Sequence, residues 1–169
     1  MDTIVFTDGS VINNCRKSKN AAGGIGIFFG VGDPRNLSEK FNKYPITNQR
    51  TELYAILKAL QIFIETEKIT KTNKTIKNLV IYSDSMYSIN TYSKWKNSWK
   101  KKGWKKADGK TPLNMDIIME YDKLENEYRN INIIFKHVKS HKNEPRKDDA
   151  AWYIWHGNDQ ADKLSRICY

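Results

Sequence analysis

The sequence predicts an α/β domain built on a five-stranded mixed sheet with helices on both faces. The first observation is that residues 1–44 hold three short runs rich in β-branched and aromatic residues, joined by turns. The second is that helical spacing of apolar residues then alternates with two further strand-like runs. The order is strand-strand-strand-helix-strand-helix-helix-strand-helix, which is typical of a mixed sheet rather than a purely parallel one.

Three strands are expected before the first helix. Residues 3–8 form the first and end at the turn pair Asp8-Gly9, residues 24–29 form the second, and residues 37–44 form the third. Their short connections favour an antiparallel meander. The glycines of the second strand do not form a GxGxxG loop that opens a helix, so they are expected to permit close backbone approach.

The first helix is expected from Arg50, where apolar residues begin to follow helical spacing, with Asn48 as its candidate N-cap. The remaining elements are expected in this order: a strand at residues 79–82, a short helix from residue 86, a long helix at residues 117–128, a strand at residues 131–138 and a last helix from about residue 158. No linker or repeat interrupts them, so residues 1–169 are expected to form a single domain.

Composition excludes several classes of protein. No apolar run approaches the roughly 20 residues that span a bilayer, so an integral membrane protein is excluded. The N-terminus lacks a basic region followed by a long apolar stretch, so the protein is expected to be intracellular, cytoplasmic or nuclear, and not secreted. Two cysteines, Cys15 and Cys168, make neither a disulfide scaffold nor a zinc motif.

The charge indicates a polyanionic partner. The net charge is +10, and residues 94–110, here called the basic segment, alone carry eight lysines and one acid. A charged run of this kind is often only a solvated loop, but Trp95, Trp99 and Trp104 interleave with the lysines. Cations that pair with phosphates, and aromatic rings that hold the element together or stack on sugars and bases, favour nucleic-acid contact.

Four acids lie where chemistry is usual in such a sheet. Asp8 and Asp84 follow apolar strands, Glu52 lies in the first turn of the first long helix, and Asp162 is expected in the first turn of the last helix. A single acid at a strand end is usually a turn former or a cap. Clustered carboxylates in a protein with a polyanionic partner need a cation between them and the phosphate, and hard oxygen ligands select Mg²⁺ or Mn²⁺.

Five motifs in the chain resemble those of the type 1 ribonucleases H. They are TDGS at residues 7–10, TNQRTEL at 47–53, YSDS at 82–85, KNSWKKKGWKKADGK at 96–110 and GNDQAD at 157–162, and they occur in the family's order. The resemblance covers residues 3 to about 166. It implies a ribonuclease H-like fold with a basic protrusion, and it implies Mg²⁺-dependent endonucleolytic cleavage of RNA in RNA–DNA hybrids, leaving 5′-phosphate and 3′-hydroxyl ends.

The resemblance also implies catalytic roles. Asp8, Glu52, Asp84 and Asp162 are similar to the family's metal-binding acids. One ion between Asp8 and Asp162 would activate water, and a second, held by Asp8, Glu52 and Asp84, would stabilise the leaving 3′ oxygen. Mn²⁺ is an expected substitute for Mg²⁺. His141 is similar to the loop histidine that shuttles protons or helps the product leave. A zinc pair of His137 and His141 would need a helix where residues 131–138 are expected to be a strand.

Substrate contacts follow from the same resemblance. They are Asn14, Asn48 and Gln49 for the minor groove, Tyr87 and Trp95 for the DNA strand, Thr47 and Asn114 for a DNA phosphate, and Lys100, Lys101 and Lys102 of the basic protrusion. Without the resemblance, the asparagines and the glutamine would be plain turn and cap residues. Pro45 stands where the family often has an arginine, which weakens the expected phosphate pocket.

Alternatives remain open at this point. A non-catalytic nucleic-acid-binding module would keep the fold and the basic segment, and another nuclease of the superfamily would act on DNA. The chain is expected to be a monomer. No N-terminal hybrid-binding domain is expected, because the chain begins almost at its first strand. Residues 145–155 lengthen the connection to the last helix and hold three aromatic residues, which we expect to form a hydrophobic plug under a loop rather than a lid over substrate.

Overall fold

The five expected strands form one mixed sheet in the computed structural model, which describes residues 1–12, 20–140 and 142–167. The strands are β1 (Asp2–Ile12), β2 (Ala22–Phe28), β3 (Leu37–Phe41), β4 (Lys77–Ser83) and β5 (Ile131–His137). Their spatial order is β3-β2-β1-β4-β5. The β1–β2 and β2–β3 pairs are antiparallel, as the meander predicts, whereas β1–β4 and β4–β5 are parallel.

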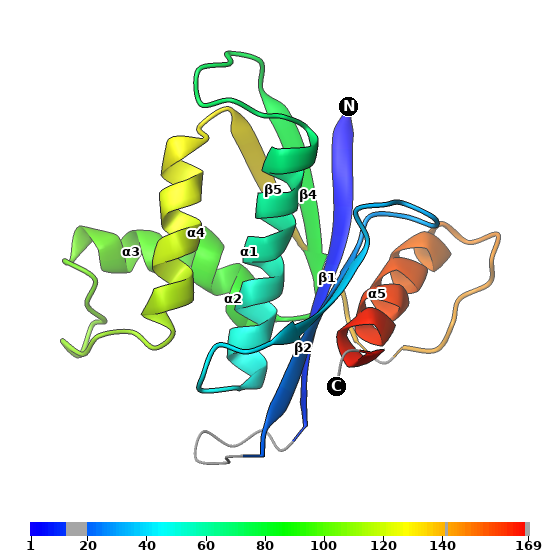
Figure 1. Ribbon diagram of the computed structural model, residues 1–169, viewed down its shortest axis with the longest axis horizontal. Coiled ribbons are helices and arrows are strands. Elements are labelled where there is room, and N and C mark those ends of the chain that lie inside the picture. The colour runs from blue at the N-terminus through cyan, green and yellow to red at the C-terminus, as the bar shows by residue number, and fades with distance from the viewer. Residues whose placement is uncertain (13–19, 141, 168–169) are drawn as a thin grey trace.

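Helices cover both faces of this sheet. They are α1 (Asn48–Thr66), α2 (Met86–Asn90), the π-helix η1 (Thr91–Trp95), α3 (Lys96–Lys101), α4 (Met115–Glu127) and α5 (Ala150–Ile167). Figure 1 shows α1 and α4 on one side of the sheet and α5 on the other. The expected architecture, a five-stranded mixed sheet between helical layers, is confirmed.

The larger core lies between α1 and the sheet. Leu53, Ile56 and Leu60 of α1 are at most 1% exposed and belong to the same cluster as Val5 of β1 and Ile81 of β4. Each such side chain contributes roughly 1.5–3 kcal/mol through its removal from water. The helical spacing of these residues therefore determines which face of α1 lies on the sheet.

The first strand does not end at Asp8-Gly9, as the sequence predicts, but continues to Ile12. It does so because its pairing with β2 extends to Ile12 opposite Ala22, while its pairing with β4 stops at Thr7 opposite Ser83. Asp8 is thus the first residue beyond the parallel pair. The turn predicted at Asp8-Gly9 is therefore wrong, but Asp8 does lie where the parallel pairing of β1 with β4 ends.

Two helix starts also differ from the expectation. Thr47, rather than Asn48, caps α1, because its hydroxyl accepts a hydrogen bond from the Arg50 amide at 3.3 Å. The last helix begins at Ala150 rather than near residue 158, after the Asp149 carboxylate accepts the Ala151 amide at 2.9 Å. Asp162 consequently lies about three turns into α5 and not in its first turn.

The aromatic residues of the inserted segment lie on this helix. Trp152 and Trp155 are half-buried and donate their indole N–H groups to the preceding loop, to Glu144 Oε1 at 3.0 Å and to the Lys142 carbonyl at 2.9 Å, which supports a plug under that loop in part. The Tyr153 ring meets the Phe6 ring with centroids 5.7 Å apart. Trp152 also stacks on His156, at 4.5 Å between centroids. Tyr153 remains 47% exposed, so the added first turns of α5 are only partly covered.

Close approach of α5 to the sheet requires Gly26 in β2. A Cβ atom at Gly26 would overlap the carbonyl oxygen of Ala161 and lie 2.6 Å from the Ser165 amide nitrogen. These atoms are helix backbone and cannot rotate away. The expectation that the glycines of this strand permit backbone approach is confirmed here.

Gly26→Ala is expected to destabilise the fold by about 1–3 kcal/mol, because the overlap forces α5 away from the sheet. Chemical denaturation measures this loss. Gly30→Ala is the matched control, since a Cβ atom there meets nothing within 4 Å, and it should change stability by no more than about 0.5 kcal/mol. Equal stability of the two variants would contradict the packing described for α5.

Candidate active site

Three carboxylates from separate elements meet at the edge of the sheet. Asp8 comes from β1, Glu52 from α1 and Asp84 from the residue after β4, and one oxygen of each lies within 4.8 Å of the others. Asp8 is only 4% exposed. A Cβ atom at Gly9 would lie 2.6 Å from the Glu52 amide nitrogen, so this glycine allows α1 to bring Glu52 against β1.

The fourth acid reaches the same place from the opposite face of the sheet. Asp162 of α5 lines one groove together with the other three acids. The Ser165 hydroxyl links Asp162 to Asp8, because it lies 3.1 Å from Asp8 Oδ2 and 2.7 Å from the Asp162 carbonyl oxygen. Arg166 donates to Asp162 Oδ1 at 3.1 Å and so holds that side chain from the next turn of α5. The four acids therefore converge, as the resemblance implies.

This convergence disfavours ionisation of the acids. Burial raises the pKa of Asp8, and the negative charges of Asp84 and Asp162 raise it further. Burial likewise raises the pKa of Glu52, together with the charges of Asp8 and Asp84. Glu52 Oε2 is buried and has no hydrogen-bond partner among the described residues.

These features fit a divalent metal ion. An unpartnered buried carboxylate oxygen costs free energy that a cation can offset, and an all-oxygen donor set suits hard cations such as Mg²⁺ and Mn²⁺. The described residues thus support the metal-binding prediction for Asp8, Glu52 and Asp84. The individual catalytic roles of the four acids remain predictions.

The groove around the acids has a volume of about 450 Å³, and its rim carries the amide side chains expected to meet the minor groove. Asn48 and Gln49 line it from the start of α1. A second hollow of about 330 Å³ shares Asp84 and Asp162 with it. Asn14 and His141, the other expected contacts here, lie outside the described residues. The zinc alternative loses its basis at His137, which belongs to strand β5 as expected.

The residues expected to hold the DNA strand also lie together. The rings of Tyr87 and Trp95 pack edge to face with centroids 6.0 Å apart, and Asn114 donates to the Tyr87 hydroxyl at 2.9 Å. Arg50, which the sequence analysis did not assign, connects this group to Thr47. Its amide bonds to Thr47, and its guanidinium lies 3.5 Å from Asn114 Oδ1.

Arg50 itself is buried and paired. It forms two hydrogen bonds with the Asp116 carboxylate, at 2.7 and 2.8 Å, and is 3% exposed. Arg50 joins α1 to α4, and no local sequence pattern predicts this contact, because residues 50 and 116 become neighbours only in the fold. It fixes the spacing of Thr47 and Asn114 whatever their function.

The three lysines expected to contact the hybrid have different surroundings. Lys101 and Lys102 are exposed at the end of α3 and just beyond it. Lys100 is also exposed, at 43% of its side chain, but it is paired with Asp122 of α4 at 2.8 Å. Of the tryptophans, Trp99 packs against the core while Trp95 is 39% exposed.

Asp8→Asn is expected to stabilise the metal-free protein at neutral pH. Because the folded state raises the pKa of Asp8, the native protein retains a proton that the unfolded chain releases above about pH 4. Stability of the metal-free wild type should therefore fall as pH rises from about 4 to neutrality. The variant should show a smaller fall, measured by thermal melts in a chelator across this pH range.

The matched control is Asp2→Asn, which removes a charge from an exposed residue at the start of β1. It should leave the pH dependence of the wild type unchanged. Addition of Mg²⁺ or Mn²⁺ should raise the melting temperature of the wild type more than that of Asp8→Asn. A metal-free Asp8→Asn variant that is less stable than the wild type at neutral pH would contradict the repulsion among the acids.

No helix in residues 1–12, 20–140 and 142–167 combines the length and apolar character needed to cross a membrane.

Comparison with known proteins adds three findings. The RNase H family model matches residues 1–168. A probable ribonuclease H of Acanthamoeba polyphaga mimivirus is 37% identical over 145 residues, which cover 86% of this chain and 57% of that protein. Ribonuclease H1 of Homo sapiens is 35% identical over 163 residues, covering 96% of this chain and 48% of that protein.

The chain thus spans about half the length of the curated relatives it matches. Solved structures agree on the fold. The PFV RNase H domain superposes with a TM-score of 0.67 at 22% identity, covering 96% of this chain and 90% of that one. LC11-RNase H1 in complex with an RNA/DNA hybrid gives 0.58 at 17% identity, covering 98% and 94%. The expected ribonuclease H-like fold is confirmed, and the family model matches nearly the whole of this chain. This chain therefore belongs to the RNase H family.

Proposed function

We propose that this chain hydrolyses the RNA strand of RNA–DNA hybrids in a reaction that depends on divalent metal ions and leaves 5′-phosphate and 3′-hydroxyl ends. The observation that carries the proposal is the convergence of four acids in one groove of a protein with net charge +10. Membership of the RNase H family supports the reaction, and a solved relative, LC11-RNase H1, is bound to an RNA/DNA hybrid.

The proposed cofactor is Mg²⁺, with Mn²⁺ as a substitute. Asp8, Glu52 and Asp84 would hold one ion and Asp8 with Asp162 a second, since Asp8 lies between these groups. Bound there, the ions would supply charge stabilisation for the reacting phosphate and lower the pKa of the attacking water.

The residues around the acids would position the substrate. Ser165 and Arg166 orient Asp8 and Asp162 through the hydrogen bonds described above. The amides of Asn48 and Gln49 can both donate to and accept from a ribose 2′-hydroxyl, the group that distinguishes RNA from DNA. Exposed lysines of the basic segment would pair with phosphates, which both strands present. His141 keeps its proposed role in proton transfer or product release.

Cleavage of a labelled RNA–DNA hybrid tests the proposal directly. We expect Mg²⁺-dependent cutting within the RNA strand, and far slower cutting of duplex DNA. Asp8→Asn should lower the rate by orders of magnitude while the protein stays folded, because the change removes a ligand charge at nearly constant shape.

Two results would favour the alternatives. Tight hybrid binding without hydrolysis at any divalent metal concentration would indicate a non-catalytic binding module. Equal cleavage of hybrid and duplex DNA would indicate a DNA-directed nuclease of the same superfamily. Wild-type turnover in Asp8→Asn would remove the metal assignment.

Asn48→Ala is expected to weaken hybrid binding by about 0.5–1.5 kcal/mol, the value of one hydrogen bond. Its melting temperature should change little, because the structure assigns the helix cap to Thr47. Thr47→Ala is the matched comparison and should lose about 1 kcal/mol of folding stability. Hybrid-binding curves beside thermal melts separate the two effects. A lower melting temperature for Asn48→Ala with unchanged hybrid affinity would defeat the recognition role.

A further inference from the structure

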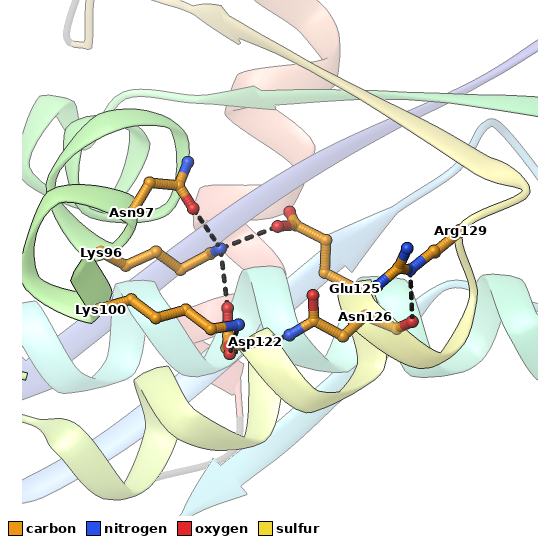
Figure 2. Close-up of polar contacts among 7 residues, drawn as sticks. All are labelled: Lys96, Asn97, Lys100, Asp122, Glu125, Asn126 and Arg129. Atoms are coloured by element: carbon orange, nitrogen blue, oxygen red, sulfur yellow. Dashed lines mark hydrogen bonds and ion pairs between the residues drawn. The ribbon is translucent and has the colours of Figure 1, made fainter. Parts of the chain in front are cut away.

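One lysine of the basic segment is not on the surface. Among the described lysines, Lys96 alone is buried, with 1% of its side chain exposed. Figure 2 shows its Nζ atom pointing from α3 toward α4, where it donates to Asp122 Oδ1 at 3.0 Å and to Glu125 Oε1 at 2.8 Å, and also to Asn97 Oδ1 at 3.1 Å. All three donors of the ammonium group are therefore used.

The backbone before Lys96 brings it to this position. The Lys96 amide donates to the Thr91 carbonyl five residues earlier, which closes the π-helix η1. A π turn holds one residue more than an α turn, so it changes the face on which the following residues lie. The Lys96 ammonium also lies 5.8 Å from the centroid of Tyr121, a fully buried ring of α4.

A second lysine joins the same group one turn later. Lys100 Nζ donates to Asp122 Oδ2 at 2.8 Å, and Asn126 donates to the same oxygen at 3.0 Å. Burial opposes ionisation of Asp122, but hydrogen bonds from Lys100 and Lys96 outweigh it and hold the pKa of Asp122 below its usual value. Lys96, Lys100, Asp122 and Glu125, here called the α3–α4 ion cluster, carry no net charge. Two of the segment's lysines are thus compensated within the protein.

This cluster matters because it joins both ends of α3 to α4. The backbone of α3 continues that of α2 and η1 without a break from Met86 to Lys101, but the segment after it up to Asn114 contains no helix or strand. Trp99 and Trp104 pack against the core, but apolar contact does not specify orientation as hydrogen bonds do. A buried charge without its partner is strongly unfavourable, so the cluster tolerates few arrangements of α3 on α4.

We propose that Lys96 is a positioning residue for hybrid binding: through Asp122 it fixes α3 on α4, and so sets where the exposed Lys101 and Lys102 meet the phosphates. The proposal rests on the proposed function, because it assumes that a hybrid is the ligand of the basic segment. It also implies that Lys100, held by Asp122, contributes less to hybrid affinity than the two lysines that follow it.

The test is a double-mutant cycle on the whole chain, with affinity for an RNA–DNA hybrid measured in a chelator. In the wild type, Lys101→Ala with Lys102→Ala should weaken binding at least about fivefold and flatten its salt dependence. In the Lys96→Met background the same double change should weaken binding less than about twofold, because the lysines are no longer positioned. In steady-state assays, Lys96→Met should raise KM while kcat stays near that of the wild type.

Two further variants separate positioning from folding. Lys58→Met is the matched control: it removes a half-buried lysine paired with Glu39 at 3.4 Å, and the lysine pair should keep its full effect in that background. Asp122→Asn removes the central charge at constant shape and should reduce the effect as Lys96→Met does. If Lys96→Met does not fold, the double-mutant cycle is measured in the Asp122→Asn background instead.

Three results would overturn the proposal. The first is a full effect of the lysine pair in the Lys96→Met or Asp122→Asn background. The second is a fall in kcat with no change in KM. The third is that Lys101→Ala with Lys102→Ala, in the otherwise wild-type chain, changes neither binding nor cleavage of the hybrid. Failure of the wild type to bind or cleave the hybrid at all would instead overturn the proposed function, so the two failures are distinguishable.

Discussion

Mutual repulsion among buried carboxylates is the constraint on which this structure depends. Asp8 and Glu52 are held so close to other acids, and so far from water, that their pKa values rise. Such a group costs stability unless a proton or a cation offsets its charge. The hydrophobic packing of α1 and α5 on opposite faces of the sheet supplies the stability that offsets this cost. The site is therefore preformed, and its charge complements cations.

The same packing explains why small residues stand at particular positions. Gly9 lets α1 carry Glu52 against β1, and Gly26 lets α5 carry Asp162 toward the same edge from the other side. A side chain at either position would separate a helix from the sheet and the acids from one another. Geometry of the site and stability of the fold thus depend on the same contacts, whereas the basic segment is held by the α3–α4 ion cluster and by the packing of Trp99 and Trp104 against the core.

Much of the fold followed from local patterns, and the exceptions have physical causes. Periodicity located the strands and the long helices, because burial on one face imposes it. It placed the end of β1 too early, since the Asp8-Gly9 turn signal is overridden by pairing with β2. It also missed the first turns of α5, where Asp149 supplies the cap. The four acids were found through their motifs. Arg50 and Lys96 were not assigned, because only the fold brings their partners Asp116 and Asp122 near.

The proposed function requires that the acid cluster bind divalent metal ions and that hydrolysis of an RNA–DNA hybrid depend on them. The most direct measurement follows Mn²⁺ binding by electron paramagnetic resonance and hybrid cleavage in the same samples, for the wild type and for Glu52→Gln. We expect saturable Mn²⁺ binding that parallels cleavage in the wild type, and a loss of both in the variant, since Glu52 Oε2 is the buried oxygen that the ion would satisfy. Cleavage that persists in Glu52→Gln at the wild-type rate, or in the wild type with all divalent ions chelated, would contradict this requirement.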